Sequence, residues 1–339
     1  MDSTVVGSFP LPNTEENFKR VFKDQINSGI TIPCYPQLVD MNHQILQPLA
    51  DILDDLSLQG KEFHLDRDVD FPKKPVATGY GKRVLDILNE EPSLKSRIHG
   101  MKACLTGPFT LCSNIIIDDE EMVAGKKPLL FREPRGHLFP ELLKKMAAFM
   151  ARVTEAYKNM GFTIISIDEP FLSQLVGRKK VLFHQQEFVK EVINEAAKNI
   201  PEEGSLHVCG TLSPLLRDML LETNLHYLDH EFETSPKNFD LFSKESLEAH
   251  GKVLAFGAIQ TNPVPIPGRE VGSYLETHEN VVTRLEDAKN RFGEDNLIIK
   301  PDCGFGGMQA FDRIEDGLGY RLAMKKLEIM TGAIETVFG

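Results

Sequence analysis

The chain has 339 residues, of which 41% are hydrophobic and 26% are charged, a composition typical of a folded globular protein. No apolar run approaches the roughly 18 residues that a membrane span requires, and the formal charge of −12 disfavours a general role on nucleic acid or anionic lipid. We therefore expect no nucleic-acid partner and no membrane association. The first residues lack the basic region and apolar core of a signal peptide, and the five cysteines form an odd, scattered set. Both features predict a cytoplasmic protein.

Strands and helices are predicted to alternate along the chain. Apolar runs predict strands at 5–9, 62–66, 102–105, 162–167, 205–208, 227–232, 252–258 and 296–299. Helical spacing of apolar residues predicts helices over 140–159, 184–199, 214–223, 236–249, 274–292 and 317–330, with Ser213 as N-cap of the third. Eight strand–helix units in a chain of this length favour an α/β fold, a (β/α)8 TIM barrel formed by residues 1–339 as a single domain, over an open doubly wound sheet.

One segment interrupts this alternation. Residues 117–135 contain the run Asp118-Asp119-Glu120-Glu121 and, further on, Lys126-Lys127-Pro128. We predict a surface insertion after the third strand, whose charges form a solvated face.

Four potential metal ligands lie in the second half of the chain. His207 and Cys209 end the fifth predicted strand, an acidic residue within 229–233 ends the sixth, and Cys303 follows the eighth. In a barrel these strand ends meet at one rim, and residues two apart in an extended segment face the same side. Two thiolates, one imidazole and one carboxylate can complete a zinc shell, so we predict one zinc ion here. The other cysteines, which lack this context, are expected to be structural: Cys34, Cys104 and Cys112.

These segments resemble a known family. His207-Val208-Cys209-Gly210, the acidic segment with Glu231 and Glu233, and Pro301-Asp302-Cys303-Gly304 are similar to the zinc site of cobalamin-independent methionine synthases, where two cysteines, one histidine and one glutamate hold zinc. Three further segments resemble motifs of that family: Val6-Gly7-Ser8-Phe9-Pro10, Leu105-Thr106-Gly107-Pro108-Phe109-Thr110 and Ile167-Asp168-Glu169-Pro170. The matches run in order along nearly the whole chain, which resembles only the catalytic C-terminal barrel of the longer, two-barrel members.

The resemblance implies both an activity and roles for individual residues. It implies a zinc-dependent methyltransferase that methylates the thiol of homocysteine to form methionine. Gly7 and Ser8 would contact the homocysteine carboxylate, and Asp168, the predicted catalytic residue, would bind its amino group. A free thiol is mostly protonated at neutral pH, and bound zinc would hold the homocysteine thiol in its deprotonated, nucleophilic form.

Two departures from the family bear on the methyl donor. The folate-using members place a histidine after the seventh strand as proton donor, whereas this chain offers Asn262, which cannot serve as that acid. A tryptophan that contacts folate in those members has no counterpart, because the chain contains no tryptophan. Methyltetrahydrofolate needs protonation before it releases its methyl group, so methylcobalamin or a corrinoid protein is the favoured donor, as is thought for short archaeal relatives.

Two assignments stay open. Spacing from Cys209 favours Glu231 as the carboxylate ligand, but Phe232-Glu233-Thr234-Ser235 resembles the family's Glu-Thr-Ser, and both glutamates alternate onto one side of a strand. For the family's acidic substrate contact after the second strand, Asp66 and Asp68 are the candidates. We prefer Glu231, which directly ends the apolar strand.

Two other functions remain possible. A methyltransferase of the same superfamily could act on another thiol, such as coenzyme M. A non-catalytic module could instead bind a corrinoid or an amino acid around a closed structural zinc. Adding thiol to a cobalt-substituted site discriminates, because only an open metal site should form a new metal–sulfur bond.

Overall fold

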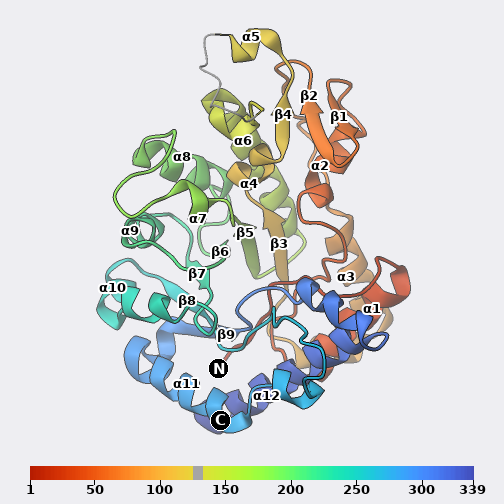
Figure 1. The fold of residues 1–339 in the computed structure, drawn as a ribbon, viewed down its shortest axis with the longest axis vertical. Coiled ribbons are helices and arrows are strands. Elements are labelled where there is room, and N and C mark those ends of the chain that lie inside the picture. The colour runs from red at the N-terminus through yellow and green to blue at the C-terminus, as the bar shows by residue number, and fades with distance from the viewer. Residues whose placement is uncertain (125–132) are drawn as a thin grey trace.

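The computed structural model describes residues 1–124 and 133–339, which form a barrel with a small accessory sheet (Figure 1). The strands are β1 Leu56–Gln59, β2 Glu62–Leu65, β3 Lys102–Thr106, β4 Ile115–Ile117, β5 Ile164–Asp168, β6 Gly204–Val208, β7 Tyr227–His230, β8 Val253–Gly257 and β9 Leu297–Lys300. The α-helices are α1 Glu15–Asn27, α2 His43–Ala50, α3 Gly79–Glu90, α4 Pro108–Ser113, α5 Glu120–Val123, α6 Pro140–Asn159, α7 Leu172–Leu175, α8 Gln186–Ala196, α9 Pro214–Leu221, α10 Lys244–Ala249, α11 His278–Phe292 and α12 Leu318–Phe338. The 3-10 helices are η1 Pro92–Arg97, η2 Gly136–Leu138, η3 Pro236–Leu241, η4 Val271–Tyr274, η5 Glu294–Asn296 and η6 Gly306–Arg313.

The barrel wall is a parallel sheet closed by two N-terminal segments. Six strands are hydrogen-bonded in the order β3-β5-β6-β7-β8-β9. The remaining gap is closed by parallel bridges between Ser3 and Ile299, Thr4 and Ile32, Ser8 and Gln37, and Cys34 and Lys102. The segments around residues 3–8 and 32–37 therefore occupy the first and second strand positions. The predicted (β/α)8 TIM barrel is confirmed.

The predicted second strand of the barrel was wrong. The run 62–66 does form a strand, β2, but β2 belongs to the separate sheet β1-β2-β4. The second strand position is taken by residues 32–37, where Pro33 and Pro36 have no N–H to donate. Pairing is therefore reduced to isolated bridges. The sequence also lacks the regular alternation of apolar and polar residues that would predict a strand.

Helix boundaries follow the expected caps with three larger corrections, of which one is that the last helix, predicted over 317–330, continues to Phe338 as α12. The predicted helix 236–249 is divided into η3 and α10, because Ser243 caps a new helix and exchanges hydrogen bonds with Ser246. The helix predicted from Tyr274 begins at His278, where the side chain of Thr277 accepts the N–H of Asn280. The side chain of Ser213 caps α9 as predicted.

The accessory sheet projects beyond the barrel together with α5 (Figure 1). β2 pairs antiparallel with β1 and parallel with β4, and Ile116 of β4 bridges to Arg135. Of the predicted insertion 117–135, residues 125–132 lie outside the described residues. In the part of the chain that the structure describes, no helix combines the length and apolarity needed to cross a membrane.

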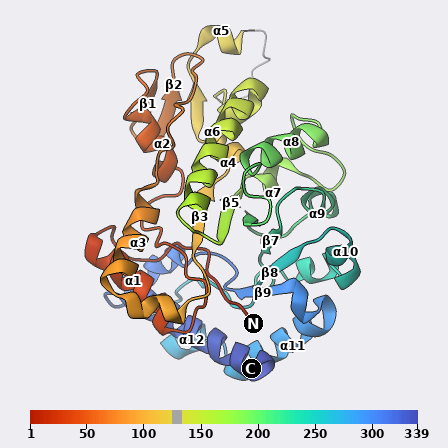
Figure 2. The same ribbon diagram turned by 180° about the vertical axis from the view of Figure 1, so that it is seen from behind.

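Most of the helices lie around the outside of the barrel (Figure 2). α6 shows why: Pro140 occupies its first turn, and its apolar residues at helical spacing, including Leu143, Met146 and Met150, are fully buried. Burying a side chain of this size contributes about 1.5–3 kcal/mol relative to exposure. The helices thereby hold the strand ends that carry the site.

A close approach at the first strand position generates a stability prediction. Gly7 has a φ of +123°, and a Cβ there would lie 2.7 Å from the sulfur of Cys104 and 2.9 Å from that of Cys34. Gly161 has a φ of +89° but no atom within 4 Å of such a Cβ. We expect Gly161→Ala to lower the free energy of unfolding by about 1 kcal/mol through backbone strain alone. Gly7→Ala should lose about 1–3 kcal/mol more through overpacking.

Urea denaturation of both variants and the wild type measures the difference. Equal losses in the two variants would contradict the packing argument.

Candidate metal and active site

A row of polar side chains lies where neighbouring barrel strands end. Thr106 is the register partner of Asp168, Asp168 of His207, and His207 of Asp229. Register partners on parallel strands project to the same side of the sheet, so these four side chains lie together. All four are buried, and Asp229 is 0% exposed.

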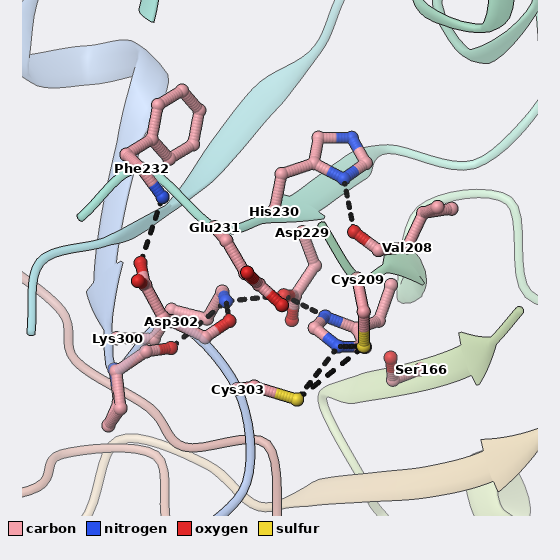
Figure 3. Close-up of polar contacts among 12 residues, drawn as sticks. Ser166, Val208, Cys209, Asp229, His230, Glu231, Phe232, Lys300, Asp302 and Cys303 are labelled. Carbon is pink, nitrogen blue, oxygen red and sulfur yellow. Dashed lines mark hydrogen bonds and ion pairs between the residues drawn. The ribbon is translucent and has the colours of Figure 1, made fainter. Parts of the chain in front are cut away.

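Three of the predicted ligands converge beside this row. His207 Nε2 lies 3.0 Å from the sulfur of Cys209 and 3.7 Å from that of Cys303, and the two sulfurs are 3.5 Å apart (Figure 3). Ligand atoms on a tetrahedral ion with bonds of about 2.0–2.3 Å are separated by about 3.3–3.8 Å. The donor set and its spacing therefore fit one zinc ion.

Asp229 orients the histidine of this triad. Its Oδ1 accepts the Nδ1–H of His207 at 2.6 Å, which turns Nε2 toward the two sulfurs. Burial lowers the pKa of His207, but the carboxylate of Asp229 outweighs burial and raises this pKa to about 10. A metal ion must therefore displace a proton from Nε2.

The two cysteines shift each other's pKa in opposite directions. The hydrogen bond from Cys209 lowers the pKa of Cys303 well below its usual range, and the neighbouring His207 acts in the same direction. The same hydrogen bond raises the pKa of Cys209, with burial and the charge of Glu231 adding to it. The contact therefore favours the thiolate form of Cys303, while Cys209 must lose its proton to become a ligand.

Asp302 joins the loop of Cys303 to the loop that follows β7. Its carboxylate accepts the N–H group of Phe232 at 2.8 Å (Figure 3), and those of Glu233 at 3.1 Å and Thr234 at 2.6 Å. The hydroxyl of Thr234 lies 2.7 Å from both Asp302 and Glu231 and can donate its one proton to either carboxylate. Lys300 donates to the carbonyl oxygen of Asp302 at 2.7 Å. This role could not be recognised from the sequence, because the partners are about 70 residues apart.

The two glutamates of the open assignment have different surroundings. The Glu231 carboxylate accepts the hydroxyl of Thr234 at 2.7 Å, whereas Glu233 forms an ion pair with Arg284. Among the described residues, the ligand atoms that lie within 4.8 Å of one another come from His207, Cys209 and Cys303, without either glutamate. In the described part of the chain no cation contacts Glu231, whereas Glu233 is paired with Arg284.

The predicted substrate residues flank the triad. Ser8 lies against the loop of Cys303: its carbonyl accepts the N–H of Phe305 at 2.8 Å, and a Cβ on Gly304 would lie 1.9 Å from its hydroxyl. On the other side, Asp168 accepts the Ser166 hydroxyl at 2.6 Å, and burial raises the pKa of Asp168. The first-strand loop and the end of β5 are thus both beside the ligands.

Other candidates lie elsewhere. Asp66 and Asp68 are exposed beside the accessory sheet, and Asp68 pairs with Lys145 at 2.8 Å, so neither follows the second barrel strand. The loop that does follow this strand contains Asp40, which accepts the N–H groups of Asn42 and His43. The cysteines expected to be structural are all buried: Cys34, Cys104 and Cys112.

Glu169 is a second residue that the sequence did not single out. Its fully buried carboxylate accepts the N–H of Phe109 and both the N–H and the hydroxyl of Thr110, at 2.6–2.8 Å. It thereby fixes the first turn of α4 to the loop after β5. A Cβ on Gly107 would lie 2.4 Å from this carboxyl group, so the close approach requires glycine there.

Comparisons with known proteins agree with this geometry. Residues 131–314 match the family model described as the cobalamin-independent synthase, catalytic domain. The chain is 26% identical over 326 residues to a methionine synthase of Methanocaldococcus jannaschii, covering 90% of this chain and 92% of that protein. It is 28% identical over 225 residues to a methionine synthase of Methanothermobacter thermautotrophicus, covering 66% and 61%.

Solved structures share the fold. A B12-independent methionine synthase from Shewanella sp. W3-18-1, in complex with selenomethionine, superposes with a TM-score of 0.67 at 16% identity, covering 99% of this chain and 97% of that one. A methyltransferase from Methanosarcina mazei gives a TM-score of 0.59 at 13% identity, covering 100% and 94%.

The buried carboxylate of Glu169 predicts a pH dependence of stability. Burial raises the pKa of Glu169 from 4.5 to about 7 and outweighs its hydrogen bonds. Because the folded-state pKa is raised, the folded chain binds this proton more tightly, and stability falls as pH rises from 4.5 to 7. At about 1.4 kcal/mol per pH unit, the loss across this window is roughly 3 kcal/mol.

Glu169→Gln cannot ionise and should lack this slope, whatever fixed cost its amide has. The free energy of unfolding is measured for the wild type and the variant from pH 4.5 to 7.5. As pH rises, the wild type should lose stability relative to the variant. A difference that stays constant would refute the assignment.

Proposed function

The chain belongs to the family of cobalamin-independent synthase catalytic domains, and we propose that it is a zinc-dependent methyltransferase that methylates the thiol of homocysteine to form methionine. The observation that carries the proposal is the approach of His207, Cys209 and Cys303 at the barrel rim, beside the first-strand loop and Asp168. Zinc, when bound, would act as a Lewis acid that keeps the substrate thiol deprotonated at neutral pH.

The chain's own residues would position the substrate. Asp168 would accept hydrogen bonds from the substrate ammonium group, whose positive charge favours the ionised form of this buried carboxylate. Gly7 and Ser8 would contact the carboxylate, which is on the same α-carbon as the ammonium group. With the α-carbon held through both groups, the sulfur at the other end of the substrate is directed at the methyl carbon, which lowers the entropic part of the barrier.

The proposed fourth ligand is Glu231. Among residues 1–124 and 133–339, its carboxylate contacts the hydroxyl of Thr234 and no cation, whereas Glu233 is already paired with Arg284. A carboxylate without a cation partner in this part of the chain is available to bind an ion.

A pair of substitutions distinguishes the two glutamates. Glu231→Gln should weaken zinc binding at least as much as loss of an outer-shell partner does, roughly 10–100-fold. Glu233→Gln should leave zinc affinity near the wild-type value, because that side chain contacts Arg284. Competition with a chromophoric chelator measures both. The reverse ranking would transfer the ligand role to Glu233.

The favoured methyl donor is methylcobalamin or a corrinoid protein. Asn262 lies against η6, the turn that follows Cys303, since a Cβ on Gly307 would be 2.2 Å from its side-chain oxygen. An amide at this place has no acidic proton to give to a folate nitrogen. A corrinoid needs none, because its cobalt leaves without protonation.

The function is tested by incubating the zinc-loaded chain with homocysteine and either methylcobalamin or methyltetrahydrofolate. We expect methionine, detected by mass spectrometry, from methylcobalamin and none from the folate; Cys209→Ser is the inactive control. Coenzyme M replaces homocysteine in a parallel reaction. Methylation of coenzyme M alone would reassign the acceptor, and no product from any pair would reject the proposal.

A further inference from the structure

Two lysines and one aspartate form a cluster in the barrel interior below the ligand triad. Lys102 Nζ from β3 lies 2.8 Å from Asp229 Oδ2, and Lys300 Nζ from β9 lies 2.8 Å from Asp229 Oδ1. The three side chains are at most 1% exposed. Burying a charge without full compensation costs several kcal/mol, so the second cation requires an explanation.

The two lysines differ in what else they hold. Lys300 also donates to the carbonyl oxygens of Pro301 and Asp302 at 3.0 and 2.7 Å, and so fixes the loop of Cys303. The side-chain amine of Lys102 donates to Asp229 alone among the described residues. Lys102 is therefore not needed to shape the loop, and its contribution to the site is its charge.

Nearby anions do not cancel this charge in the working complex. Asp168 is the other buried carboxylate near Lys102, and it accepts a hydrogen bond from Ser166. In the proposed function, Asp168 pairs with the substrate ammonium group, so it is neutralised by the substrate. One positive charge then remains in excess around Asp229.

The metal shell has the opposite imbalance. Two thiolates and the Glu231 carboxylate would bring three negative charges to an ion with two positive ones, and a substrate thiolate adds a fourth. In a dry interior such charges interact strongly over several ångströms. Asp229 connects the excess positive charge to the metal shell, because it contacts Lys102 through Oδ2 and the proposed ligand His207 through Oδ1.

We propose that Lys102 is a positioning residue that acts through Asp229, and that its charge favours binding of the substrate sulfur as a thiolate. The inference rests on the proposed function and deepens it by naming a residue of this chain, outside the metal shell, that stabilises the bound thiolate. Asp229 keeps His207 oriented through Oδ1, while Lys102 contacts Oδ2. Removing Lys102 therefore changes the charge and leaves the histidine in place.

The test uses Co²⁺-loaded protein, in which a new sulfur–cobalt band reports binding of homocysteine. K102M should retain the Co²⁺ affinity and spectrum of the wild type, but its dissociation constant for homocysteine should rise roughly 10–100-fold. K102M/D229N restores the charge balance, and the introduced amide oxygen can still accept the Nδ1–H of His207. Its homocysteine affinity should return close to the wild-type value.

K252M is the matched control. Lys252 is also buried, but it donates to the carbonyl oxygens of Thr223 and Leu225, just before β8 begins. It should cost stability without changing the homocysteine affinity.

The outcomes separate this inference from the proposed function. Unchanged homocysteine affinity in K102M, or a double variant that binds homocysteine tenfold or more weakly than the wild type, would overturn the charge role. The second criterion applies even if K102M alone does not fold. Equal losses of Co²⁺ and homocysteine binding in K102M would show a purely structural role. A wild type that binds no Co²⁺ would reject the metal site, and the inference with it.

Discussion

The carboxylate of Asp229 is the interaction on which the rest of the site depends. It is fully buried and contacts Lys102 from β3, His207 from β6 and Lys300 from β9. These partners hold the pKa of Asp229 well below its usual range against the opposing effect of burial. A carboxylate left there without them would carry a large desolvation cost. The contacts that join the two edge strands β3 and β9 across the barrel interior therefore use the same carboxylate that orients the histidine.

Buried polar groups also fix the loops that carry the other ligands. Asp302 gathers the N–H groups of residues 232–234, and Asn238 donates to the carbonyl oxygens of Gly210 and Glu231. The loops after β6, β7 and β9 are thus tied to one another below the rim. A site held in this way loses little entropy when it binds a ligand, which is the advantage of preorganisation.

Much of the fold could be predicted because its periodic signals are local. α6 begins and ends as its apolar spacing indicated, and the strands of the second half lie within a few residues of their predicted positions. The second strand could not be found, because Pro33 and Pro36 remove the donors that a regular strand needs. The prediction instead assigned the second barrel strand to the apolar residues of β2. Only the pairing of β2 with β1 and β4 shows that it belongs to another sheet.

The site could be predicted where chemistry and spacing coincide along the chain. His207 and Cys209 are two residues apart, so their common orientation follows from strand geometry alone. Asp229, Asp302 and Glu169 could not be recognised, because each acts on a partner 22 to about 70 residues away. The open choice between Glu231 and Glu233 has the same origin. β7 ends at His230, so strand alternation does not separate the two glutamates. The distinction comes from Arg284, a distant residue whose ion pair engages Glu233, while no cation contacts Glu231 among the residues that the structure describes. The proposed ligand is therefore distinguished by a competing contact that it lacks, which no local pattern in the sequence could indicate.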